Sequence, residues 1–207
     1  MQHRKCCYCE AYIPEEGHLK AVEHFRPQSV YRNLMNDWPN LLLACAQCNG
    51  KKSDKFPTEL ADGTKVVRSK PGRRARPLLI DPSNDRVDPE DHLDFAVDIK
   101  NESEILGLIR PKNDSKRGEA TIRTTGLADS FHTMRHKNHI RAWLWDLLVM
   151  DQAKERGDQT QLEQFRQKFR STLSAANEFA AIARAFAREY QLVNRFRVEI
   201  SASWNAA

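Results

Sequence analysis

The sequence predicts an α+β protein with a small cysteine-rich N-terminal core, a β-hairpin region and a C-terminal helical bundle. All five cysteines lie within the first 48 residues, and four of them form two Cys-x-x-Cys pairs. Residues 95–99 and 105–109 are short apolar segments on either side of a polar stretch, which predicts a β-hairpin. Beyond residue 129, apolar residues recur at steps of three or four, which is typical of helices. We expect the three parts at residues 1–56, 57–128 and 129–207.

The composition is that of a globular protein with a polyanionic partner. The chain has 207 residues, of which 40% are hydrophobic and 29% are charged, and its formal net charge is +5. Because Lys and Arg that neutralise phosphates release counterions, this charge favours nucleic acid as the partner. The longest apolar stretch, residues 41–46, is far shorter than the roughly 18 residues of a membrane helix, and the N-terminus lacks the apolar core of a secretory signal. We therefore expect a soluble, cytoplasmic protein with no membrane partner.

The two cysteine pairs, Cys6/Cys9 and Cys45/Cys48, predict a structural zinc site. Each pair places two thiolates on one edge of a metal ion through a tight turn, and two pairs complete a tetrahedral site. Four thiolates leave Zn²⁺ no open position for water, so this ion contributes folding energy and not catalysis. Cys7 is a rival to Cys6, but Cys7-x-Cys9 is a poorer chelating span, and we expect Cys7 to be an extra thiol.

A second set of motifs lies between and just after the cysteine pairs. Residues 22–27 read Val-Glu-His-Phe-Arg-Pro, residues 38–45 read Trp-Pro-Asn-Leu-Leu-Leu-Ala-Cys, and residues 49–52 read Asn-Gly-Lys-Lys. This combination resembles the HNH endonuclease family, in the subtype stapled by two zinc knuckles. In detail, the residues of these motifs resemble the HNH component of Septu and retron-associated anti-phage systems (the PtuB group). The detailed resemblance covers residues 6–52, about a quarter of the chain.

The resemblance implies a ββα-metal core, in which a β-hairpin and the following helix face each other across a cleft. It makes His24 the general base that takes a proton from water, a task that suits an imidazole near neutral pH. Glu23 and Asn49 are the implied ligands of a catalytic Mg²⁺ or Mn²⁺, since both offer hard oxygen atoms. Asn40 matches the middle residue of the motif, whose side chain ties the hairpin loop together and orients the base from behind. Asn49 stands where the name-giving pattern has His, which we interpret as a subtype difference.

Basic residues close to these motifs are candidates for contacts with nucleic acid. Lys51 or Lys52 could hold a phosphate, and Arg26 is a second candidate. A basic run follows in a stretch with the composition of an exposed loop, with a short hairpin expected around Gly63. Its members are Arg68, Lys70, Arg73, Arg74 and Arg76. The run is interpreted either as a charged loop or as a surface for backbone contacts.

Two helical segments are expected in the C-terminal part. Residues 142–150 are apolar on more than one face, which predicts a buried helix, and residues 159–192 carry one apolar stripe, which predicts a single long helix. His132, His136 and His139 share a helix face in basic surroundings. We expect that face to be solvated or to face phosphates, rather than to bind a second metal.

The resemblance implies a phosphodiester hydrolase that acts on DNA in anti-phage defence, beside an ABC-type ATPase (PtuA-like) that controls it. RNA, including tRNA, is an alternative substrate, because no residue identifies a reader of deoxyribose or of the 2′-hydroxyl. A further alternative is a non-catalytic, zinc-dependent module that binds nucleic acid or protein. The paired acid and base at Glu23 and His24 argue against that alternative, since a binding module needs neither.

Overall fold

The structure is a computed structural model that describes residues 2–15, 20–60, 63, 65–66, 75–100 and 104–189. It divides the chain into two compact units. Unit 1 comprises residues 1–94 and 109–129, and unit 2 comprises residues 95–108 and 130–207. No helix among the described residues has the length and apolar character that crossing a membrane requires.

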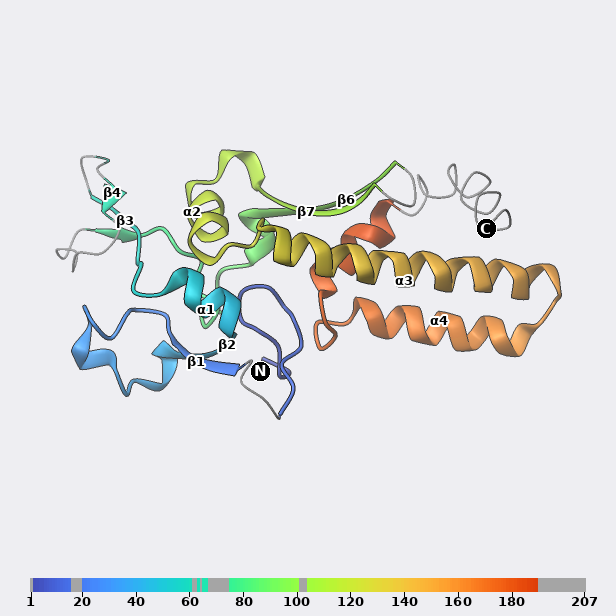
Figure 1. Ribbon diagram of the computed structural model, residues 1–207, viewed down its shortest axis with the longest axis horizontal. Helices are drawn as coiled ribbons and strands as arrows, with labels where there is room; N and C mark the ends of the chain where they lie inside the picture. The colour runs from blue at the N-terminus through green and yellow to red at the C-terminus, as the bar shows by residue number, and fades with distance from the viewer. Residues whose placement is uncertain are drawn as a thin grey trace. The chain divides into compact units, whose positions relative to one another are not determined.

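Unit 1 contains a β-hairpin followed directly by a helix. Strands β1 (Lys20–His24) and β2 (Leu41–Cys45) pair antiparallel, and helix α1 (Ala46–Lys52) continues from the end of β2 (Figure 1). Cys45 caps this helix, because its Sγ accepts a hydrogen bond from the backbone N–H of Cys48. The strand therefore ends, and the helix begins, at a residue of the cysteine motif. The predicted α+β class is confirmed.

The long connection between β1 and β2 is held by two short 3₁₀ turns and a small apolar core. The turns are η1 (Arg32–Leu34) and η2 (Trp38–Asn40). The rings of Phe25 and Phe56 meet edge to face with centroids 5.4 Å apart. The buried members of this core are Phe25, Tyr31, Leu42, Phe56 and Leu79. Residues far apart in the sequence thus fix the hairpin on which the candidate site is built.

A small three-stranded sheet follows α1 in unit 1. Its order is β4-β3-β5, with β3 (Thr58–Glu59) paired antiparallel to both β4 (Lys65–Val66) and β5 (Arg76–Pro77). The β3–β4 pair confirms the short hairpin predicted around Gly63. Of the predicted basic run only Arg76 is described, and the residues at 67–74 lie outside the described part of the chain. The remaining short elements of unit 1 are η3 (Pro89–Asp91), η4 (Lys112–Asp114) and α2 (Lys116–Thr125).

The predicted hairpin of the middle segment is confirmed. Strands β6 (Leu93–Ile99) and β7 (Ile105–Pro111) form a two-stranded sheet. The boundary between the two units falls within both strands, after Asp94 and before Ile109. The segment predicted as residues 57–128 therefore contributes to both units.

Unit 2 is dominated by two helices that run side by side. Helix α3 (Ser130–Glu155) turns at Gly157, whose φ is +70°, into helix α4 (Gln159–Leu173) (Figure 1). The ammonium of Lys168 on α4 contacts the carboxylate of Asp146 on α3 at 2.6 Å. The predicted C-terminal helices are confirmed.

The prediction of one helix over residues 159–192 is wrong. Helix α4 ends at Leu173, residues 174–179 are turns, and residues 180–189 are helical again. Two side chains in the interruption bind backbone N–H groups that a continuous helix would use: Ser174 Oγ accepts from Ala176 and Asn177 Oδ1 accepts from Glu178. Ser and Asn compete with helical hydrogen bonds in this way, so the apolar stripe overstated the length of the helix.

The histidines of α3 also correct the sequence prediction. His132 and His136 are fully buried, at 0% and 1% exposure. The His136 ring lies 4.8 Å from the ring of Phe179, and a Cβ at position 107 would lie 2.6 Å from its Cβ. Gly107 thus lets β7 approach α3 closely. A solvated or phosphate-facing surface is therefore wrong for these two residues, because their face of α3 packs inside unit 2.

The burial of His136 predicts a loss of stability at mildly acidic pH. Burial, with the neighbouring His132, His139 and Arg135, lowers the pKa of His136 from 6.5 to about 4, although Gly107 O accepts its hydrogen bond. Because the pKa of His136 is lower in the folded than in the unfolded state, the folded protein is more stable while this imidazole is neutral than after it is protonated. The contribution is complete above pH 6.5 and disappears as the pH falls towards 4. Its size is about 3 kcal/mol.

The prediction is measured by urea unfolding between pH 7.5 and pH 4. The wild-type free energy of unfolding is expected to fall more steeply with acid than that of His136→Gln. His3→Gln, a change at an exposed histidine, should keep the wild-type slope. Identical slopes for the wild type and His136→Gln would contradict the prediction.

Candidate functional site

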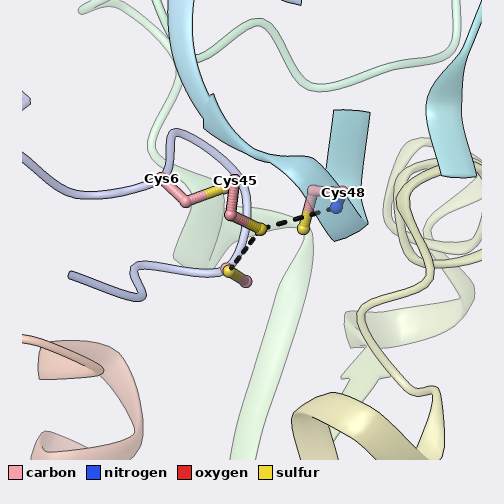
Figure 2. A group of neighbouring side chains, drawn as sticks. Cys6, Cys45 and Cys48 are labelled. Atoms are coloured by element: carbon pink, nitrogen blue, oxygen red, sulfur yellow. Dashed lines mark hydrogen bonds between the residues drawn. The ribbon is translucent and has the colours of Figure 1, made fainter. Parts of the chain in front are cut away.

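Four cysteines from two distant segments meet in one cluster. Cys6 and Cys9 lie in the N-terminal loop, Cys45 ends β2, and Cys48 lies in the first turn of α1. Their Sγ atoms all lie within 4.8 Å of one another, and all four residues are buried. Figure 2 shows the side chains of Cys6, Cys45 and Cys48 gathered at one point. The N-terminal loop is thereby fixed to the junction of β2 and α1.

The spacing of the sulfur atoms fits a tetrahedral thiolate site. With Zn–S bonds of about 2.3 Å, the sulfurs of such a site lie about 3.8 Å apart. Cys9 and Cys45 are separated by 3.8 Å. Hydrogen bonds from Cys45 and Cys48 lower the pKa of the Cys6 thiol, whereas the hydrogen bond with Cys45 raises the pKa of Cys48. Four buried thiols this close ionise together only when a cation compensates their charge.

Cys7 stands apart from this cluster. It is partly buried and packs against the apolar core around Phe25 and Phe56. Burial raises the pKa of its thiol well above the usual value. The structure therefore groups Cys6, and not Cys7, with the other three cysteines.

A separate cleft lies between the end of β1 and helix α1. Its volume is about 330 Å³. Three residues of the predicted site, Glu23, His24 and Asn49, line it together. The other lining residues are Val22, Pro27, Gln28, Ser29, Gly50, Ser53 and Asp54. The strand and the helix thus bring an acid, an imidazole and an amide to one space that is distinct from the cysteine cluster.

The imidazole of His24 has a defined orientation. Its Nε2 lies 3.0 Å from the backbone oxygen of Met35. Because a carbonyl oxygen only accepts hydrogen bonds, Nε2 carries the proton, and Nδ1 of the neutral ring keeps its lone pair. The same hydrogen bond stabilises the imidazolium that forms when Nδ1 takes up a proton. The geometry therefore suits a general base that acts through Nδ1.

Asn40 joins both ends of the loop that carries the Met35 carbonyl. Its Oδ1 accepts a hydrogen bond from the N–H of Arg26 at 2.7 Å, and its Nδ2 donates to the oxygens of Arg26 and Leu34 at 3.1 and 3.0 Å. The side chain is buried and its amide makes three hydrogen bonds to backbone. Leu34 directly precedes Met35, so this amide fixes the segment that holds His24.

Glu23 and Lys52 form a buried ion pair behind the cleft. Their side chains are 2% and 0% exposed, and Glu23 Oε1 also accepts a hydrogen bond from the Tyr8 hydroxyl at 3.2 Å. Lys52 Nζ donates a further hydrogen bond to the backbone oxygen of His24 at 2.9 Å. Burial raises the pKa of Glu23, and the charge of Lys52 partly offsets this rise. Lys52, expected at a phosphate, instead ties α1 to the end of β1.

Removing the ammonium of this buried pair should strongly destabilise unit 1. Lys52→Met leaves the carboxylate of Glu23 buried without its cation, and losing one partner of a buried pair costs about 3–5 kcal/mol. The free energy of unfolding in urea measures the loss. Lys51→Met is the matched control, because Lys51 pairs with Asp129 at 2.6 Å and both side chains are far more exposed, at 47% and 39%. That change should cost about 1 kcal/mol or less. Equal effects of the two substitutions would refute a structural role for Lys52.

The other predicted phosphate contacts have partners of their own. The guanidinium of Arg26 lies over the rings of Phe56 and Tyr31, at 5.3 and 6.0 Å from the centroids. Lys51 is exposed and paired with Asp129, as described above. Arg26 and Lys51 remain accessible, since neither is buried.

Two contributors to the site escaped the sequence reasoning. Met35 acts through its backbone oxygen, which no residue type at that position would reveal. Tyr8 lies inside the Cys-x-x-Cys motif, where attention falls on the cysteines, and its hydroxyl reaches Glu23 only after the cysteines have drawn the N-terminal loop onto β2.

Comparison with known proteins assigns this arrangement to a family. Residues 6–55 match the HNH endonuclease family. The chain carries an HNH endonuclease domain. The matched range contains the four clustered cysteines, the hairpin and α1, so the predicted resemblance to this family is confirmed for residues 6–55.

Two similar proteins bear the name Septu protein PtuB. The chain is 50% identical to one from Bacillus thuringiensis over 52 residues, which are 25% of this chain and 20% of that protein. It is 32% identical to another from Bacillus mycoides (strain KBAB4) over 142 residues, which are 61% of this chain and 44% of that protein. The chain therefore spans less than half the length of either relative.

A third relative has a different name. Septu protein PtuA from Bacillus mycoides (strain KBAB4) is 33% identical over 136 residues, which are 57% of this chain and 16% of that protein. PtuB from the same strain matches 61% of this chain and PtuA matches 57%. The two matched shares add up to more than the whole chain, so the two alignments overlap on it. The similarity to PtuA is a likeness of sequence over part of this chain and does not itself indicate association. No solved structure matches the chain.

Proposed function

We propose that this protein is a metal-dependent endonuclease that hydrolyses phosphodiester bonds of nucleic acid, with DNA as the favoured substrate. The observation that carries the proposal is the His24 imidazole in the cleft of the HNH domain, with Nε2 bound to a carbonyl and Nδ1 left as a base. The net charge of +5 suits a polyanionic substrate.

Zn²⁺ in the four-cysteine cluster would serve the fold and not the reaction. Four thiolates close the coordination sphere of zinc, which leaves no position for water or phosphate. The cluster joins the N-terminal loop, β2 and α1, and so sets the positions of the two walls of the cleft.

Glu23 and Asn49 are the proposed ligands of a catalytic divalent cation, Mg²⁺ or Mn²⁺. Both residues line the same cleft, one from β1 and one from α1, and both have the hard oxygen donors that these ions prefer. Oε1 of Glu23 is engaged by Lys52 and Tyr8, which fixes the carboxylate at the cleft wall. When bound, the cation neutralises charge that develops on the phosphate during hydrolysis.

The remaining roles belong to side chains around this carboxylate. His24 takes the proton of the attacking water on Nδ1. Asn40 holds the loop segment that carries the Met35 carbonyl, and through it the imidazole. Arg26 and Lys51 are the proposed phosphate contacts.

We further propose that the protein is the nuclease of an anti-phage defence system and works with an ABC-type ATPase of the PtuA kind. The similarity to two proteins named Septu protein PtuB supports this placement. Co-expression with a PtuA-type ATPase, followed by size-exclusion chromatography, tests the association. Separate elution of the two proteins at micromolar concentration would count against it.

A cleavage assay tests the proposed activity. The zinc-loaded protein, alone and with the ATPase, is incubated with supercoiled plasmid, phage DNA and tRNA in Mg²⁺ or Mn²⁺. Nicking or linearisation of the DNA is the expected result. Cleavage confined to tRNA would replace DNA by RNA as the substrate, and binding without cleavage of any substrate would leave only a non-catalytic zinc module.

A further inference from the structure

Three residues with exposed apolar side chains lie close to the candidate base in the fold. Val22, Met35 and Trp38 are 68%, 45% and 82% exposed, respectively. Trp38 is the most exposed of the large hydrophobic side chains in the described part of the chain. An indole is costly to leave in water, so an aromatic ring at such exposure, on the same loop as the carbonyl that binds His24, marks a contact surface.

Backbone contacts place this group next to His24. Met35 supplies the carbonyl that binds the His24 ring at 3.0 Å. The oxygen of Trp38 accepts a hydrogen bond from the N–H of Leu41, which lies directly opposite His24 in the β1–β2 ladder. Val22 precedes His24 by two residues on β1, so both side chains project from the same face of the strand, and both line the cleft.

Trp38 is also held in a fixed position. It begins turn η2, and the fixed φ of Pro39 restrains the backbone directly after it. Asn40, the next residue, is buried and ties this turn to Arg26 and Leu34. The ring is no member of the apolar core around Phe25 and Phe56, to which Tyr31 also belongs. A rigid backbone that presents an exposed ring is what a stacking platform requires.

We propose that Trp38 stacks on an unpaired base next to the scissile phosphate, so that the preferred substrate is single-stranded or carries an unpaired nucleotide at the cut. The inference rests on the proposed nuclease function and adds the substrate class to it. Every nucleobase presents a π-face, and stacking on aromatic side chains is a general way of binding unpaired bases without reading sequence. Bases inside a continuous duplex are stacked on each other, and reach such a ring only after unstacking.

Intrinsic fluorescence provides a direct test, because stacking on a base quenches an indole. The His24→Ala protein is titrated with a fluorescein-labelled oligothymidylate and with a duplex of equal length, and anisotropy gives the affinities. Trp38→Ala should weaken binding of the single strand about 10-fold, within the range of roughly 5- to 150-fold known for base–aromatic stacking. The same change should weaken binding of the duplex much less. Trp38→Phe should keep most of the affinity and lose the quenching.

Trp145→Phe is the matched control, since Trp145 is 58% exposed on α3 and lies outside the HNH domain. It should leave both quenching and affinity unchanged. Unaltered single-strand affinity in Trp38→Ala would overturn the proposal, as would quenching that survives Trp38→Phe. A Trp38→Ala protein that binds nucleic acid normally but loses its complex with the ATPase or with itself would reassign the ring to a protein interface.

The outcome is separable from that of the nuclease proposal. Cleavage by the wild type with no effect of Trp38→Ala refutes stacking and leaves the nuclease intact. Quenching and a Trp38-dependent affinity, without cleavage by the wild type, refute the nuclease and leave the binding site. The urea midpoint of Trp38→Ala should equal that of the wild type, because so exposed a ring buries little surface on folding.

Discussion

Replacing Cys48 with serine is expected to abolish zinc binding and to unfold the HNH domain. Cys48 is 0% exposed, and its sulfur is one of the four that lie within 4.8 Å of each other. Structural zinc contributes about 10–16 kcal/mol to the folding of small zinc-finger peptides, and the net stability of a typical protein is about 5–15 kcal/mol. The stabilisation lost with the ion should therefore be larger than the stabilisation that the small core around Phe25 and Phe56 supplies.

Two measurements check this prediction together. Atomic spectrometry should find about one zinc ion per wild-type chain and almost none in Cys48→Ser. Hydrogen exchange should show the amides of β1 and β2 protected in the wild type and unprotected in the variant. Cys7→Ala is the matched control, because Cys7 lies outside the cluster and should leave zinc content unchanged. A zinc-free Cys48→Ser protein with wild-type protection would show that the cluster does not hold the fold.

Replacing His24 with alanine is expected to slow cleavage by about 10²- to 10⁴-fold without affecting the fold. General-base catalysis by a positioned side chain contributes a factor of this size. His24 is half-buried at the wall of an open cleft, and its side-chain hydrogen bond is to a single carbonyl. Its removal should cost little stability and leave zinc content unchanged.

Initial rates on supercoiled plasmid at saturating Mn²⁺ measure the effect. His3→Ala is a suitable control, since His3 is exposed and outside the cleft. It should cleave at the wild-type rate. A His24→Ala rate within a factor of two or so of the wild type would remove His24 from the chemistry.

Much of the HNH domain could be predicted from the sequence because short motifs mark its cysteine cluster and its candidate site. The Cys-x-x-Cys spacing predicted the cluster, and the resemblance of the Glu-His and Asn-Leu motifs to the HNH family implied the hairpin and the helix that follows. Asn40 was expected to brace the loop, and the structure gives its side chain three hydrogen bonds to backbone.

Lys52 shows where such reasoning ends. Because Lys52 follows Lys51 in the sequence, both were interpreted as exposed cations that could contact phosphate. The difference between them is tertiary: Lys52 meets the buried Glu23 and the end of β1, whereas Lys51 meets Asp129 near solvent. The position of Lys52 one helical turn after the buried Cys48 is the one signal that could have indicated its burial.

The C-terminal helices were likewise predicted only in part. Periodicity located them, but it could not reveal that Ser174 and Asn177 divert backbone N–H groups and end α4. Nor could it show that His132 and His136 lie inside unit 2, because their burial depends on the close approach that Gly107 allows to β7.

Chemical rescue tests the central claim most directly, namely that the imidazole of His24 is the base and the cysteine cluster only a scaffold. His24→Gly opens a space at the wall of the cleft that free imidazole can enter from solvent. The plasmid-cleavage rate of the zinc-loaded variant should rise with imidazole concentration, while the wild-type rate does not. Wild-type cleavage by His24→Gly in the absence of imidazole would contradict the account.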